Sequence, residues 1–127
     1  MDKTALVSID IAQGEMALAA MDAANIGVCV AVFVYLSAYD DWRLVIASKS
    51  LDSDGPQQRY LRVNDAMMSA GIGSRQAPSV MIMKTTDPFV RDLRKVFGKA
   101  KSVEGMRLGG QSFGDRYVED GFAYRIS

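Results

Sequence analysis

Three segments of the chain carry apolar residues at helical spacing. They cover residues 10–27, 56–71 and 85–98, and in each the apolar positions recur every three or four residues along one face. Asp10 and Asp87 suit the start of the first and third segments, because an aspartate side chain caps the free N–H groups of a helix. We therefore expect three amphipathic helices, of which the third has the most regular pattern.

Strand-like patterns occupy the segments between these helices. Residues 28–36 are apolar on both faces, which is typical of a central strand that is covered on each side. Residues 42–48 alternate between two faces, and the polar stretch before them suits a turn. We expect a β-hairpin here, followed by a loop at 48–56 and, later, a short buried strand at 79–83.

The C-terminal tail lacks a helical period and is predicted to form strands. Its segment Gly109–Asp115 has the outline of a phosphate-binding loop, with two glycines five residues apart. Asp115 and Arg116, however, stand where such a loop needs lysine and a hydroxyl group. The segment is therefore predicted to turn the chain, and two-residue turns are expected at Gly109–Gly110 and Asp120–Gly121. The strands would cover residues 104–108, 111–118 and 122–126.

The resulting order, roughly α-β-β-α-β-α-β-β, predicts an α+β fold, a mainly antiparallel sheet with about three helices packed on it. The chain has 127 residues, of which 49% are hydrophobic and 24% are charged. A chain of this length and composition forms one hydrophobic core. Because no linker-like stretch interrupts the sequence, we expect residues 1–127 to form a single domain.

The composition argues against several kinds of chemistry. Fifteen basic and fifteen acidic residues cancel, so no overall field attracts nucleic acid or an anionic membrane. The sequence contains no histidine, which removes Ser-His-Asp and Cys-His catalysis and the commonest zinc ligand. The single cysteine, Cys29, forms no disulfide within the chain, and we expect a buried, reduced thiol in a cytoplasmic protein. No metal or cofactor is expected.

An alternative is a magnesium-dependent nuclease or phosphotransfer enzyme that works without histidine. Asp41 before a strand, Lys49 after it and Glu15 on the preceding helix follow in outline the arrangement of metal-dependent nucleases. Ala47 stands where the second acidic ligand belongs, so the carboxylate pair that would hold Mg²⁺ is incomplete. Glu15, Asp41 and Lys49 remain the candidates for catalysis.

Two groups of basic residues are candidates for binding an anion or a nucleic acid. Arg91, Arg94 and Lys95 would share the outer face of the third helix, and Arg107 and Arg116 lie in the tail. Such cations suit a phosphate backbone, which makes a nucleic-acid-binding module the second alternative. Cations near the C-terminal end of a helix also stabilise the helix itself. In addition, no aromatic residue lies among these basic residues to stack on bases. We therefore do not expect nucleic acid as a partner.

The leading hypothesis is a non-catalytic interaction or regulatory domain that self-associates. A strand that is apolar on both faces and three amphipathic helices give more apolar surface than one small domain readily hides. We therefore expect a homo-oligomer that also offers a surface to a protein partner. No membrane association is expected, because the longest apolar run, residues 28–36, is about half of a membrane span.

Overall fold

The computed structural model describes residues 8–73, 75–98 and 103–127, with side chains from residue 11 onward. The helices in these ranges are α1 (Ser8–Ala23), α2 (Lys49–Asp52), α3 (Pro56–Ser69) and α4 (Pro88–Phe97). The strands are β1 (Val28–Leu36), β2 (Asp41–Ser48), β3 (Val80–Ile82), β4 (Gln111–Phe113) and β5 (Arg116–Ile126). The α+β class that the sequence predicts is confirmed.

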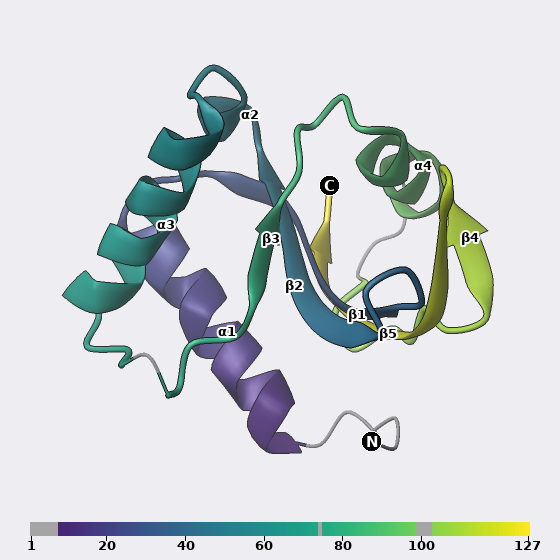
Figure 1. Ribbon diagram of the computed structural model, residues 1–127, viewed down its shortest axis with the longest axis horizontal. Helices are drawn as coiled ribbons and strands as arrows, with labels where there is room; N and C mark the ends of the chain where they lie inside the picture. The colour runs from purple at the N-terminus through teal and green to yellow at the C-terminus, as the bar shows by residue number, and fades with distance from the viewer. Residues whose placement is uncertain (1–7, 74, 99–102) are drawn as a thin grey trace.

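The strands pair into one sheet in the order β3-β2-β1-β5-β4. β1 lies at the centre, antiparallel to both β2 and β5, whereas β2 and β3 run parallel. The predicted hairpin is confirmed, since Phe33 lies opposite Leu44 and Tyr35 lies opposite Trp42. The parallel pair arises because α3 carries the chain back along the sheet between β2 and β3 (Figure 1).

Helices cover both faces of the sheet, with α1 and α3 on one face and α4 on the other (Figure 1). Val30, Val32 and Val34 of β1 pack in the cluster that includes the apolar face of α4. Ala31 and Phe33, which point the other way, pack with the apolar faces of α1 and α3. This two-sided burial explains why β1 is apolar at nearly every position.

The predicted start of α1 at Asp10 is wrong, whereas its predicted end is correct. α1 already includes Ser8, so Asp10 lies within the helix, and the side chain of Asp10 lies outside the described residues. After the last turn, Asn25 has a φ of 58°, and the Ile26 N–H donates to the Met21 carbonyl oxygen over 3.1 Å. A residue with positive φ after a helix turns the chain so that the next N–H groups donate to the last free carbonyl oxygens of the helix.

The expected loop at 48–56 contains the short helix α2. The Ser48 hydroxyl accepts a hydrogen bond from the Ser50 N–H over 3.2 Å and so caps the start of α2. Four residues are too few to show a helical period, so the hydrophobic pattern gives no sign of this helix.

The C-terminal strands differ from the prediction at one of their two turns. Gly110 has a φ of 78° and turns the chain as expected. The turn expected at Asp120–Gly121 is wrong, because β5 runs unbroken through both residues, and the second turn falls at Gly114–Asp115. Within the described range that starts at Val103, residues 104–108 form no strand and contribute an isolated bridge to β5.

Gly121 is explained by packing rather than by a turn. It lies opposite Val34 of β1, and a Cβ atom at Gly121 would lie 3.0 Å from Val34 Cγ1 and 3.2 Å from Leu108 Cβ. The segment around Leu108 therefore packs closely against β5 at Gly121, where a side chain would leave no room for it.

Cys29 is half-buried rather than buried, which corrects the expectation from its apolar surroundings. The pairing of β1 with β2 is irregular between Val28 and Val30, and such a bulge interrupts the alternation of a strand. At this bulge the Cys29 thiol donates to the Ala47 carbonyl oxygen, 3.4 Å away.

Candidate functional site

A hollow of about 520 Å³ opens at one end of the sheet, and we call it the end hollow. Three segments that are distant in sequence line it: the turn after β1, the start of α4 and the start of β5. Its residues are Leu36, Ser37, Ala38, Asp87, Pro88, Phe89, Asp115, Arg116 and Tyr117. The volume falls in the range of small-molecule sites.

Gly114 brings the start of β5 against the start of α4. It has a φ of 59°, and a Cβ atom on it would lie 2.8 Å from both the Phe89 nitrogen and the Pro88 carbonyl carbon. The Gly114 N–H donates to the Asp92 carboxylate of α4 over 2.9 Å. The glycine segment therefore turns the chain, as predicted. It also packs against the start of α4, a contact that the sequence around Gly114 does not indicate.

The start of α4 offers little to an anion in spite of its position beside the end hollow. Pro88 at the first helical position has no N–H, and the Asp87 side chain accepts from the Phe89 N–H over 2.9 Å. The Asp87 and Asp115 carboxylates that line the hollow add negative charge. This combination does not support a phosphate site at the start of the helix.

Aromatic and arginine side chains gather beside the end hollow. The guanidinium groups of Arg43 and Arg116 lie 5.2 Å and 5.9 Å from the centre of the Tyr39 ring, within cation–π range. Arg116 also donates to the Tyr39 hydroxyl over 3.4 Å. The Tyr35 hydroxyl donates to the Asp40 carboxylate, which raises the pKa of Tyr35 to about 12. Tyrosine and arginine are enriched at protein–protein interfaces.

The structure brings together three of the basic candidates. Arg91, Arg94 and Lys95 line a second hollow of about 460 Å³ with Gly98 and Ser127, and we call it the basic hollow. The Arg94 Nε donates to the Ser127 carbonyl oxygen over 2.8 Å. Helical periodicity is the sequence signal that places these three cations on one face.

The other two basic candidates have interactions of their own. Arg107 pairs with Asp120, with 3.1 Å between the guanidinium nitrogen and the carboxylate oxygen. Arg116 lies over the Tyr39 ring and lines the end hollow. Neither residue lines the basic hollow.

The catalytic candidates do not converge on one site. Asp41 begins β2 and Lys49 follows its last residue, so a whole strand, roughly 25 Å at about 3.3 Å per residue, separates them. The Asp41 carboxylate accepts from the Trp42 N–H over 2.8 Å. Glu15 is exposed on α1. Among residues 8–73, 75–98 and 103–127, no three side chains of aspartate, glutamate or cysteine are grouped so as to hold a metal ion.

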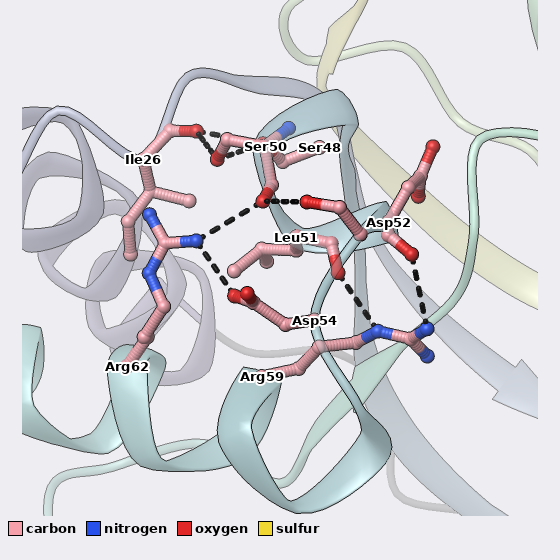
Figure 2. A network of polar contacts seen from close by, with 9 residues as sticks. Ile26, Ser48, Ser50, Leu51, Asp52, Asp54, Arg59 and Arg62 are labelled. Atoms are coloured by element: carbon pink, nitrogen blue, oxygen red, sulfur yellow. Dashed lines mark hydrogen bonds and ion pairs between the residues drawn. The ribbon is translucent and has the colours of Figure 1, made fainter.

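A dense polar network around α2 has a structural role (Figure 2). The Ser48 and Ser50 hydroxyls both donate to the Ile26 carbonyl oxygen over 2.6 Å. Arg59 of α3 donates to backbone carbonyls of α2, and Arg62 donates to the Asp54 carboxylate over 2.8 Å. These groups join α2, α3 and the loop after α1, and the bonds occupy the polar atoms that would otherwise suggest a site.

The outer surface of α3 carries large apolar side chains. Leu61 is 48% exposed and Met68, one heptad further on, is 72% exposed. Beside them lies a hollow of about 390 Å³, which we call the α3 hollow. Its residues are Asn64, Met67, Met68, Ile72, Ala77 and Pro78. Exposed apolar side chains grouped in this way mark an interaction surface.

No family model matches the sequence, and neither the curated proteins nor the solved structures give a significant match. None of the helices in the described ranges has the length and apolar character needed to cross a membrane.

Proposed function

We propose that the protein is a non-catalytic interaction domain that self-associates through the outer surface of α3. The observation that carries this proposal is the 72% exposure of Met68 directly beside the α3 hollow. Leaving such a side chain in water costs about 1.5–3 kcal/mol relative to burying it. A second copy of the chain would cover both Met68 and Leu61.

The arrangement suits a two-fold dimer. In an isologous interface each contact occurs twice, because both copies use the same surface. Met68 of each copy can therefore enter the α3 hollow of the other copy. Met68 supplies a flexible side chain that fills irregular gaps.

The geometry favours this proposal over the two alternatives. A magnesium-dependent enzyme would need Asp41 and Lys49 close together, and β2 holds them apart. A nucleic-acid-binding module would need a long positive surface, whereas Arg107 is paired with Asp120 and the net formal charge of the chain is zero.

Sedimentation velocity of wild type, Met68→Lys and Val96→Lys tests the proposal. Both positions lie one residue before the last residue of their helix, and Val96 is 58% exposed on α4, on the opposite face of the sheet. Lysine in the last turn of a helix is favourable, so neither variant is expected to unfold. We expect a wild-type dimer at micromolar concentration, a monomer for Met68→Lys and a dimer for Val96→Lys.

Two outcomes would contradict the proposal. A wild-type monomer at these concentrations would remove self-association altogether. A dimer that persists in Met68→Lys, and likewise in the double variant with Leu61→Lys, would place the interface on another surface.

A further inference from the structure

We propose that the basic hollow binds the phosphate group of a small phosphorylated molecule. The proposal concerns α4, on the face of the sheet opposite α3, and does not depend on self-association. Three cations, Arg91, Arg94 and Lys95, line this hollow together with Gly98 and Ser127. Among the described residues, no aspartate or glutamate side chain lines it.

Unlike three arginines elsewhere in the fold, Arg91 and Lys95 have no aspartate or glutamate partner among the described residues. Arg62, Arg107 and Arg125 are each paired with an aspartate at 2.8–3.1 Å. Arg91 and Lys95 form no ion pair within the described part of the chain. Because they lie four residues apart on one helix, their like charges repel by about 0.2–0.5 kcal/mol. An oxyanion between them would replace that repulsion with attraction.

The end of α4 does not by itself account for the cluster. Arg94 and Lys95 lie in the last turn, where cations offset the negative end of the helix dipole. Arg91 lies before that turn, so helix stability does not explain its position. The bond from Arg94 Nε to the Ser127 carbonyl oxygen fixes the guanidinium at the edge of the hollow. A guanidinium held in this way has further N–H donors for phosphate oxygens.

The surroundings of the hollow favour a small ligand over a nucleic acid. A volume of about 460 Å³ admits a phosphorylated metabolite. Neighbouring cations on a helix lie about 5–6 Å apart at their Cβ atoms, a spacing that surrounds one or two phosphate groups. Within the described ranges, no aromatic side chain lines the hollow to stack on a base. The chemistry recognised is therefore a phosphate ester or polyphosphate.

Isothermal titration calorimetry with inorganic tripolyphosphate tests the site, using wild type, the double variant Arg91→Gln/Lys95→Gln and the control Arg75→Gln. Arg75 is an exposed arginine in the loop before β3, so its removal changes the net charge but not the basic hollow. We expect a wild-type Kd below about 1 mM at low salt. Affinity should fall by at least about tenfold in the double variant and remain unchanged in Arg75→Gln.

Each other result would overturn the proposal. No binding to the wild type would exclude the site. An equal loss of affinity in Arg75→Gln would show that tripolyphosphate responds only to the net charge of the protein and not to the basic hollow. In a parallel arm, duplex DNA that binds more tightly than tripolyphosphate, with steep salt dependence, would assign the surface to nucleic acid instead. Far-ultraviolet circular dichroism of every variant confirms that a loss of binding is not a loss of fold.

Discussion

The Tyr60 hydroxyl of α3 accepts a hydrogen bond from the Ile82 backbone N–H of β3, over 3.0 Å. β3 is an edge strand of the sheet. The neighbouring Met83 N–H donates to the Ile46 carbonyl oxygen of β2, and because N–H directions alternate along a strand, the Ile82 N–H points away from the sheet. Tyr60 therefore binds the Ile82 N–H, a donor that a further strand would need in order to pair with this edge of the sheet.

Tyr60→Phe should lower stability and open this edge. The Ile82 N–H loses its partner, which costs about 1–3 kcal/mol if the group stays buried, and an uncovered edge promotes strand-to-strand association. Urea denaturation should show the lower stability, and sedimentation should show species larger than those of the wild type. Tyr117→Phe is the control, since Tyr117 is 48% exposed and has no hydrogen bond through its hydroxyl in the described structure. Identical behaviour of the two variants would refute a role for Tyr60 at the edge.

Asp22 and Arg125 connect the end of α1 to β5 and make the stability of the fold depend on pH. The guanidinium meets the carboxylate through two bonds of 2.9 Å and 2.8 Å, and it also donates to the Val28 carbonyl oxygen. The hydrogen bond from Arg125 lowers the pKa of Asp22 below its ordinary value of 3.8. Both side chains are more than a third exposed, so the pair contributes at most about 1 kcal/mol.

Because folding lowers this pKa, the stabilisation is complete above pH 3.8 and is lost as the pH falls through the folded value. Asp22→Asn should therefore be less stable than wild type near neutral pH and should approach it in acid. Urea denaturation of both proteins at several pH values measures the difference. Asp65→Asn serves as the control, since Asp65 is exposed and forms no ion pair in the described ranges. A difference for Asp22→Asn that does not change with pH would contradict the prediction.

The parts of the fold that the sequence predicts are those determined by local patterns. The hairpin shows the apolar run of β1, the alternation of residues 42–48 and the polar turn between them, and α4 shows a complete apolar face. The turn expected at Asp120–Gly121 fails because the absence of a side chain at Gly121 serves packing against Leu108, which no local pattern reveals. α2 is held by Arg59 and Arg62 from the next helix, so its stability is not contained in its own four residues.

The same distinction applies to the candidate sites. Arg91, Arg94 and Lys95 follow a helical period, so the sequence places them on one face. The end hollow joins segments near residues 37, 88 and 116, and its formation depends on contacts between them. A single sequence gives no sign that Gly114 lies against Pro88.

Tyr35 should ionise above the ordinary pKa of a tyrosine, 10.0. Its hydrogen bond to Asp40, with smaller contributions from burial and nearby carboxylates, raises its pKa to about 12. The folded pKa lies above the ordinary value of 10.0, so the resulting stabilisation is present below pH 10 and is lost as the pH rises toward 12. Spectrophotometric titration of the tyrosines should show a late step that comes from Tyr35.

Asp40→Asn should move that late step toward pH 10. Asparagine tolerates the positive φ of 50° at this position, so the turn should be retained. Asp41→Asn is the matched control, because Asp41 lies next in the chain but does not accept a hydrogen bond from Tyr35. Equal effects of the two substitutions would show that general charge, rather than the hydrogen bond, controls Tyr35.

Gly114→Ala should destabilise the fold more than Gly110→Ala. Both glycines have positive φ, 59° and 78°, and an alanine there costs about 1–2 kcal/mol. Among the described residues, no atom lies within 4 Å of a Cβ built on Gly110, whereas a Cβ on Gly114 would lie 2.8 Å from backbone atoms of Pro88 and Phe89. Backbone at the start of α4 moves less readily than the end of a side chain, so the extra cost at Gly114 comes from separating β5 from α4.

Thermal and urea denaturation of the two alanine variants measures this difference directly. We expect Gly110→Ala to lose about 1–2 kcal/mol and Gly114→Ala to lose clearly more. In Gly114→Ala the bond from the Gly114 N–H to Asp92 should also weaken, and amide hydrogen exchange at residue 114 should be faster than in Gly110→Ala. Equal losses in the two variants would mean that φ alone determines the cost. The contact between this turn and α4 would then contribute nothing to the stability of the end hollow.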